Sequence, residues 1–196
     1  MAGHAKLKVR PGAGSDVRRG ADLRALRFGV AVAEFNDFVT EPLLEGALEG
    51  FSDSGVDRKQ LEIVKVPGSF ELPVAAKKMA ATGRFDALIC IGCVIRGETS
   101  HYDYVCSETA RGIQLAQLDS GVPVGFCVLT CDTKEQALAR AGGKDTNKGY
   151  AAALGAIEMA RLSRTYSANA RNSPPLAAKP RSSRAARHPK SAKRRP

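Results

Sequence analysis

The sequence predicts an α/β protein, a three-layer sandwich in which helices cover both faces of a four-stranded parallel sheet. Three observations lead to this fold class. Four apolar runs are short and continuous, as in strands that are buried on both faces. Each run is followed by a stretch with helical periodicity, and the links between them are short. Right-handed crossovers then favour a doubly wound, flavodoxin-like sheet with strand order 2-1-3-4.

The first strand and helix begin the foldable part of the chain. The apolar run at 27–33 predicts a buried strand. The helix predicted at 38–54 has Pro42 in its first turn, where proline is tolerated, and Gly55 as its stop. Its apolar stripe consists of Leu43, Leu44, Ala47, Leu48 and Phe51.

The same reasoning gives the other elements. The remaining strands are predicted at 61–66, 87–94 and 122–129. The remaining helices are predicted at 72–81, 102–119 and 133–141, and from Asn147 through Leu162.

The two ends of the chain differ in composition from its middle. Residues 1–26 are rich in Gly, Arg and Ala and predict a flexible arm with one short strand at 5–9. Residues 167–196 have too few apolar residues to fold, which predicts a disordered basic tail. One folded domain is therefore expected at 27–166.

The net charge of +10 belongs to these ends. Residues 168–196 contain nine Lys and Arg and no acid, whereas residues 28–167 contain 14 basic and 18 acidic residues. The folded body is therefore mildly acidic. The tail could bind nucleic acid or an acidic cargo electrostatically, or it could simply be solvated.

Membrane insertion and secretion are both disfavoured. No apolar run reaches the roughly 20 residues that span a bilayer, and the N-terminus lacks a secretory apolar region. The five cysteines lie in apolar segments, which argues against a disulfide framework. Cys90 and Cys93 have a redox or zinc spacing, but residues three apart on a strand point to opposite faces, so buried thiols are expected. We expect a soluble cytoplasmic protein.

Ligands of doubly wound sheets bind at the carboxyl ends of the strands, so four loops are of interest. In the first, Phe35 and its neighbour Asn36 follow a strand; Phe35 could stack on a planar ligand or cap the core. In the second, the run from Ser69 to Glu71 can present backbone groups to a ligand, although Ser69 could instead cap the next helix.

The third loop offers an anion site beside an acid/base group. Glu98, Thr99 and Ser100 are suitable helix-start residues, whose N–H groups would face an anion. His101 can exchange protons near neutral pH, although an isolated histidine is often structural. Arg96 lies close by in the sequence.

The fourth loop carries Arg140, which suits a bidentate phosphate contact, in a Gly-rich link that could equally be a solvated turn. Neither of the familiar Gly-rich nucleotide-binding patterns is present. No His, Cys and carboxylate cluster has the spacing of a metal site, so no metal is expected.

Taken together, the four loops resemble those of the 6,7-dimethyl-8-ribityllumazine synthase family, which catalyses the penultimate step of riboflavin synthesis. The resemblance runs from about Phe28 to Leu162. The matching segments are Phe35-Asn36, Val66-Pro67-Gly68-Ser69-Phe70-Glu71-Leu72-Pro73, Gly92 to Val105 with the run Arg96-Gly97-Glu98-Thr99-Ser100-His101, and Gln136-Ala137 through Arg140-Ala141-Gly142-Gly143 to Asn147-Lys148-Gly149.

The resemblance implies a reaction without a metal or an organic cofactor. 5-Amino-6-(D-ribitylamino)uracil condenses with 3,4-dihydroxy-2-butanone 4-phosphate to give the lumazine. The implied catalytic residues are His101, as proton shuttle, and Lys148. The implied substrate-binding residues are Phe35, Asn36, Ser69, Phe70, Glu71, Cys93, Val94 and Ile95 for the pyrimidine and its ribityl chain, Glu98, Thr99 and Arg140 for the phosphate, and Phe126 from a neighbouring subunit.

The resemblance also implies a homo-oligomer. The family forms pentamers with sites between subunits, and some members close pentamers into an icosahedral capsid. The link from Arg140 to Lys148 is short, which permits such a shell. Two alternatives remain open: a catalytically weak protein that binds flavin precursors, and a shell or scaffold whose basic tail gathers cargo or nucleic acid.

Overall fold

A computed structural model of the chain describes residues 22–172, with side chains described as far as residue 167. The strands are β1 (Phe28–Ala33), β2 (Leu61–Val66), β3 (Ala87–Ile95) and β4 (Val124–Cys131). The helices are α1 (Asp37–Asp53), α2 (Leu72–Ala81), α3 (His101–Ser120), α4 (Lys134–Ala141) and α5 (Lys148–Asn172). Three short 3₁₀ turns, η2 (Leu23–Ala25), η3 (Arg58–Gln60) and η4 (Ser69–Glu71), complete the described elements.

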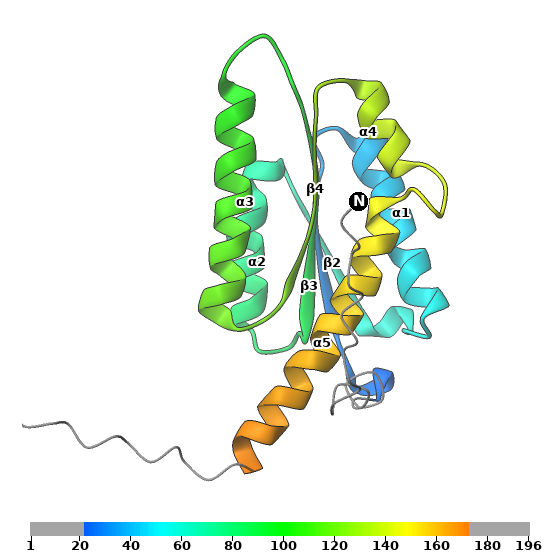
Figure 1. Cartoon of the computed structure of the whole chain (residues 1–196), viewed down its shortest axis with the longest axis vertical. Helices are drawn as coiled ribbons and strands as arrows, with labels where there is room; N and C mark the ends of the chain where they lie inside the picture. Colours follow the sequence, from blue (N-terminus) through cyan, green and yellow to red (C-terminus); the bar gives the residue numbers. More distant parts are fainter. Residues whose placement is uncertain (1–21, 173–196) are drawn as a thin grey trace, which may run out of the picture.

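The four strands form one parallel sheet in the order β2-β1-β3-β4, which confirms the predicted fold class. Helices α2 and α3 cover one face, and α1, α4 and α5 cover the other (Figure 1). Strand β4 lies at one edge of the sheet. Because neighbouring strands are parallel, each connection between successive strands must cross over the sheet, and a helix makes each crossing: α1 between β1 and β2, α2 between β2 and β3, and α3 between β3 and β4.

The sheet divides the apolar core into two clusters. All six residues of β1 are buried, because this central strand is covered on both faces. On one face Phe28 packs against Phe51 of α1, with ring centroids 4.9 Å apart. On the other face Leu88 and Ile113 belong to the cluster beneath α2 and α3. The continuous apolar character of the strands thus follows from burial on both sides.

Most element boundaries lie within one residue of the prediction, and β4 and α5 differ by more. Strand β4 begins after Pro123, because proline has no N–H to donate to the ladder, and it continues to Cys131, whose carbonyl accepts from the backbone N–H of Arg96 at 2.9 Å. Helix α5 was predicted through Leu162, with the end of the domain at 166, and it runs to Asn172; the first proline after its start is Pro174.

The predicted strand at 5–9, most of the N-terminal arm and most of the basic tail lie outside the described residues. Within residues 22–172, no helix is both long and apolar enough to cross a membrane.

Candidate functional site

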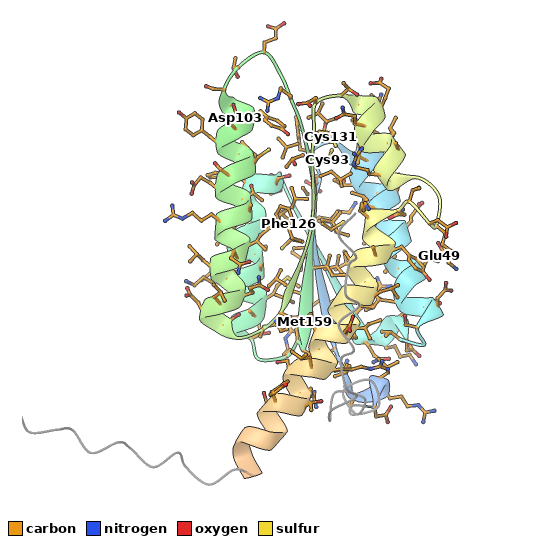
Figure 2. All side chains as sticks on the ribbon, in the orientation of Figure 1. Glu49, Cys93, Asp103, Phe126, Cys131 and Met159 are labelled. Carbon is orange, nitrogen blue, oxygen red and sulfur yellow. The ribbon has the colours of Figure 1, made fainter. Side chains whose placement is uncertain are left out.

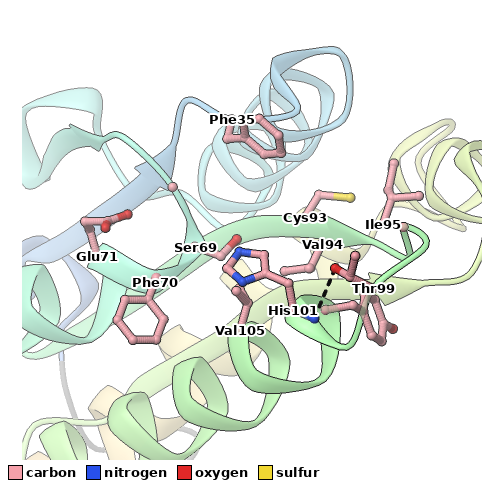
Figure 3. Close-up of a pocket in the computed structure, with 13 residues that line it drawn as sticks. Phe35, Ser69, Phe70, Glu71, Cys93, Val94, Ile95, Thr99, His101 and Val105 are labelled. Carbon is pink, nitrogen blue, oxygen red and sulfur yellow. Dashed lines mark hydrogen bonds between the residues drawn. The ribbon is translucent and has the colours of Figure 1, made fainter.

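A cavity of about 410 Å³ opens at the carboxyl end of β3, and we call it the β3 cavity (Figure 3). It gathers residues from three of the four predicted loops. Nine of the predicted site residues line it: Phe35, Ser69, Phe70, Glu71, Cys93, Val94, Ile95, Thr99 and His101. Four further lining residues are Gly68, Gly97, Tyr102 and Val105.

Phe35 stands at the mouth of this cavity on a loop that is fixed from both sides. The backbone N–H of Phe35 donates to the carbonyl of Pro67 at 3.0 Å. Asn36 has a left-handed backbone (φ 62°, ψ 45°), and its side-chain amide donates to the carbonyl of Cys93 at 3.0 Å. Asparagine is among the few side chains that tolerate this conformation. Phe35 is 70% exposed, so it does not cap the core and is free to stack on a planar ligand.

The opposite wall is formed by η4. Ser69 is buried, and its carbonyl accepts from the hydroxyl of Thr109 in α3 at 3.2 Å. A side chain at Gly92 of β3 would come within 2.6 Å of the Ser69 hydroxyl, so glycine is required there for this close approach. Ser69 does not cap α2, which begins only at Leu72 without a side-chain cap. Ser69 is thus held facing the cavity.

The floor between these walls is apolar. Cys93 lies there with Val94 and Ile95. Burial raises the pKa of the Cys93 thiol to about 12, so the group is a neutral thiol near pH 7 and not a nucleophile. Cys90 and Cys93 belong to the clusters on opposite faces of the sheet, which confirms the expectation of buried, separate thiols.

The start of α3 forms the polar end of the cavity. Ser100, the residue before the helix, makes no capping side-chain hydrogen bond, and the hydroxyl of Thr99 accepts from the backbone N–H of His101 at 3.4 Å. The backbone N–H of Asp103 also donates within the turn, to the carbonyl of Ser100 at 3.0 Å. The remaining N–H groups at the start of this long helix can bind an anion. The His101 ring points into the cavity (Figure 3). Glu98 is exposed and does not line the cavity, so its side chain is not placed at the predicted phosphate site.

A second cavity, of about 460 Å³, lies along the edge strand, and we call it the β4 cavity. It contains three of the five predicted residues that the β3 cavity lacks: Phe126, Arg140 and Lys148. Phe126 is 49% exposed, and a guanidinium N–H of Arg140 donates to the carbonyl of Gln136 at 2.8 Å. Within one chain, Arg140 is thus not brought to the Thr99 end of the β3 cavity.

Tyr102 and Val105 were not predicted as site residues. Helical spacing could have indicated Val105, which lies one turn after His101 on the same face of α3. Tyr102 packs against Arg96, whose guanidinium carbon lies 4.0 Å from the centre of the tyrosine ring, and no sequence pattern shows that contact. In the described part of the chain, no group of three or more His, Cys, Asp or Glu side chains could hold a metal ion.

Comparison with known proteins agrees with this geometry. Residues 25–164 match the family model described as 6,7-dimethyl-8-ribityllumazine synthase. A protein of that name from Desulfatibacillum aliphaticivorans is 53% identical over 140 residues, which cover 71% of this chain and 90% of the relative. Another from Syntrophus aciditrophicus (strain SB) is 52% identical over 141 residues, covering 72% and 92%.

Proposed function

The chain belongs to the 6,7-dimethyl-8-ribityllumazine synthase family, and from this premise we propose that the β3 cavity of one subunit and the β4 cavity of its neighbour close into one active site. The enzyme is a transferase of riboflavin biosynthesis. It condenses 5-amino-6-(D-ribitylamino)uracil with 3,4-dihydroxy-2-butanone 4-phosphate to give 6,7-dimethyl-8-ribityllumazine, phosphate and two molecules of water. The two alternatives, a catalytically weak binding protein and a scaffold, are not favoured. His101 lines the β3 cavity and Arg140 lines the β4 cavity, so both residues expected for catalysis and phosphate binding are present.

The division of chemistry between the two cavities carries this proposal. The β3 cavity has an exposed aromatic ring, a helix N-terminus and a histidine, but no Lys or Arg lines it. The β4 cavity has two cations, Arg140 and Lys148, beside an exposed aromatic ring. A helix N-terminus and cations both bind the phosphate of a substrate, and together they bind it more tightly than either does alone. Two subunits packed side by side would supply both.

In the β3 cavity, Phe35 stacks on the pyrimidine ring above the apolar floor formed by Cys93, Val94 and Ile95. Backbone groups of Ser69 and Phe70, with the carboxylate of Glu71, hold the ring edge and the ribityl chain. The side-chain amide of Asn36 is already bonded to the Cys93 carbonyl, so its part is to hold Phe35 in place.

The phosphate of the second substrate lies at the start of α3, against Thr99, and receives Arg140 from the neighbour. The 5-amino group of the pyrimidine then attacks the ketone, and one water leaves as the imine forms. Phosphate is eliminated next. The ribityl-bearing nitrogen then attacks the remaining carbonyl carbon, and a second water leaves as the ring closes. His101 moves protons in the imine-forming and phosphate-elimination steps. Holding two substrates in one orientation supplies much of the rate.

Replacement of His101 tests this assignment. With the two substrates mixed and lumazine formation followed by absorbance, His101→Ala should lower the single-turnover rate above the spontaneous reaction on the order of 10²-fold, because proton transfer loses its carrier. Tyr104→Phe is the control, since Tyr104 lies on the same first turns of α3 but does not line the cavity. An unchanged rate in His101→Ala would remove the proton-transfer role. Wild type no faster than the spontaneous reaction would instead support a binding or scaffold protein.

The assembly that we propose is a pentamer, and closure into an icosahedral capsid is compatible with the short link between α4 and α5. Exposed apolar side chains on three elements support oligomerisation: Leu115 and Leu118 on α3, Phe126 on β4, and Leu154 and Met159 on α5. The five free cysteines support a cytoplasmic location, where thiols stay reduced.

For the basic segment at 168–196, we propose electrostatic binding of nucleic acid. It lies outside the family match and holds nine Lys and Arg without an acid. Non-specific binding of single-stranded RNA should weaken steeply between about 50 and 200 mM salt and should be lost when the segment is deleted, while lumazine formation is retained. Salt-sensitive binding that survives the deletion would exclude this role, and so would the absence of binding by the full chain.

A further inference from the structure

Arg96 follows β3 and is held on three sides by residues of its own chain. Its Nε donates to Asp132 at 2.9 Å, and a terminal N–H donates to Asp103 at 3.2 Å. Its guanidinium carbon lies 4.0 Å from the centre of the Tyr102 ring. Arg96 lines neither the β3 nor the β4 cavity. The guanidinium is therefore engaged in internal contacts at the edge of the site and is not presented to the substrate.

One set of these contacts fixes the start of α3. Tyr102 and Asp103 lie in the first turn of that helix, directly after His101, and Tyr102 itself lines the β3 cavity. Arg96 thereby joins the two ends of the turn that contains Gly97 and Thr99. Figure 2 shows Asp103 at the start of α3 and Cys131 at the end of β4, at the same end of the sheet.

The other contact leads to α4. Asp132 follows β4 directly, and its backbone N–H donates to the side chain of Gln136 at 2.9 Å. The backbone carbonyl of Gln136 accepts from the guanidinium of Arg140 at 2.8 Å. A continuous series of polar contacts thus runs from the turn before α3, through Arg96, Asp132 and Gln136, to Arg140 in the β4 cavity.

These contacts are too exposed to serve mainly as stabilisers. The side chains of Arg96, Asp103 and Asp132 are 44%, 59% and 66% exposed. Solvent-exposed ion pairs contribute little to the free energy of unfolding. The guanidinium fork is nonetheless rigid and directional, so it fixes relative positions even where it adds little stability.

We propose that Arg96 is a positioning residue that holds the anion-binding turn before α3 and the Arg140 side chain in a fixed relation. The inference rests on the proposed function, in which the turn and Arg140 of one chain serve two neighbouring active sites. Loss of one side chain outside both cavities then loosens both halves of the phosphate subsite. The pyrimidine subsite, built from Phe35 and η4, keeps its own anchors.

Two substitutions separate positioning from charge. Arg96→Met removes both, whereas Arg96→Lys keeps the charge but cannot form the fork. Both should raise the KM for the butanone phosphate by about 10-fold or more and lower kcat/KM on the order of 10²-fold, with the KM for the pyrimidine within about 3-fold of wild type. The matched control is Arg84→Lys, because Arg84 makes a similarly exposed two-pronged pair with Glu62 at 2.7 and 3.0 Å, outside both cavities. It should leave both KM values unchanged.

The two arms can be separated as well. Asp103→Asn loosens the turn and Asp132→Asn loosens α4, so each should raise the KM for the butanone phosphate. Neither should add to the effect of Arg96→Met, because residues of one network act non-additively. Additive effects, or full activity in Arg96→Lys, would overturn the inference.

Binding of inorganic phosphate, measured by calorimetry, gives a readout that does not depend on turnover. Arg96→Met and Arg96→Lys should bind phosphate about 10-fold more weakly than wild type, with melting temperatures within about 2 °C of it. If the wild-type protein is active and both variants bind phosphate as tightly as it does, the inference about Arg96 is wrong and the proposed function is unaffected. If wild type binds phosphate but does not exceed the spontaneous rate, the proposed function fails, and the comparison of phosphate affinities still decides the role of Arg96.

Discussion

Chains with His101→Ala and chains with Arg140→Ala should each be nearly inactive alone, yet should recover activity when they are co-expressed in equal amounts. His101 lies in the β3 cavity and Arg140 in the β4 cavity of the same chain. In a ring, each proposed site takes one cavity from each of two neighbours. Random mixing then leaves about a quarter of the sites with both residues intact, so about a quarter of wild-type activity should return.

The matched control is a pair of variants whose substituted residues both line the β3 cavity. Co-expression of His101→Ala with Thr99→Ala should recover nothing, because every site then takes its β3 cavity from a defective chain. Oligomers of the two recovering variants that are mixed only after assembly should also stay inactive. Sedimentation of the active fraction should give a pentamer or a larger assembly. Recovery by the Thr99 pair, or an active monomer, would contradict a site shared between subunits.

The fold could be predicted because its signals are local. Continuous apolar runs marked the buried strands, and their alternation with helical stripes left few topologies to consider. The helix at 72–81 and the strand at 61–66 were predicted with the bounds that the structure has. The boundaries of β4 could not be predicted as well, because its end depends on a hydrogen bond from Arg96, a residue on another strand's loop.

The residues that line the cavities could largely be predicted, but which of them share a cavity within one chain could not. The prediction placed Arg140 with Thr99 at one phosphate. In the chain, α3 and α4 cover opposite faces of the sheet, so the start of one and the end of the other open to different cavities (Figure 1). The spacing of residues in the sequence does not show which cavity a residue lines. That assignment requires the strand order and the edge position of β4.

Contacts between side chains and distant backbone groups were also beyond sequence reasoning. The amide of Asn36 reaches the carbonyl of Cys93, 57 residues further along the chain. Arg96 could be noted as a nearby cation, but its engagement by Asp103 and Asp132 could not be predicted. Such contacts depend on tertiary geometry, and here they determine how the predicted site residues are presented.

Asn147 was predicted only as part of a segment that resembles the family, and its side chain has a structural role near the β4 cavity. It is buried just before α5, with all four of its hydrogen-bonding positions used. Its amide donates to the carbonyls of Pro42 at 2.9 Å and Ala141 at 2.7 Å. Its side-chain oxygen accepts from the backbone N–H groups of Gly149 at 2.8 Å and Tyr150 at 3.2 Å. It therefore joins α1, α4 and α5.

Asn147→Ala should lower the free energy of unfolding by about 3 kcal/mol, because it leaves buried carbonyls and N–H groups without their partner. Equilibrium unfolding in urea measures this loss. The control is Thr133→Ala at the start of α4, where an exposed side chain accepts one hydrogen bond at 3.3 Å and about 1 kcal/mol is expected. Activity should fall with Asn147→Ala as well, because Arg140 and Lys148 lie on α4 and α5, two of the three helices that Asn147 joins.

Asn147→Asp gives the sharper test. Aspartate is as good as asparagine at an ordinary helix start, so a simple capping role predicts little change. In wild type the NH₂ group of Asn147 donates to the carbonyls of Pro42 and Ala141. In Asn147→Asp a carboxylate oxygen would face these two carbonyls instead. Neither carbonyl can donate a hydrogen bond or neutralise the buried charge. Asn147→Asp should therefore be at least as unstable as Asn147→Ala at pH 7 and should regain stability as the pH falls and the carboxyl is protonated, because the folded state raises its pKa. Wild-type stability of Asn147→Asp at pH 7 would show that capping alone accounts for this residue.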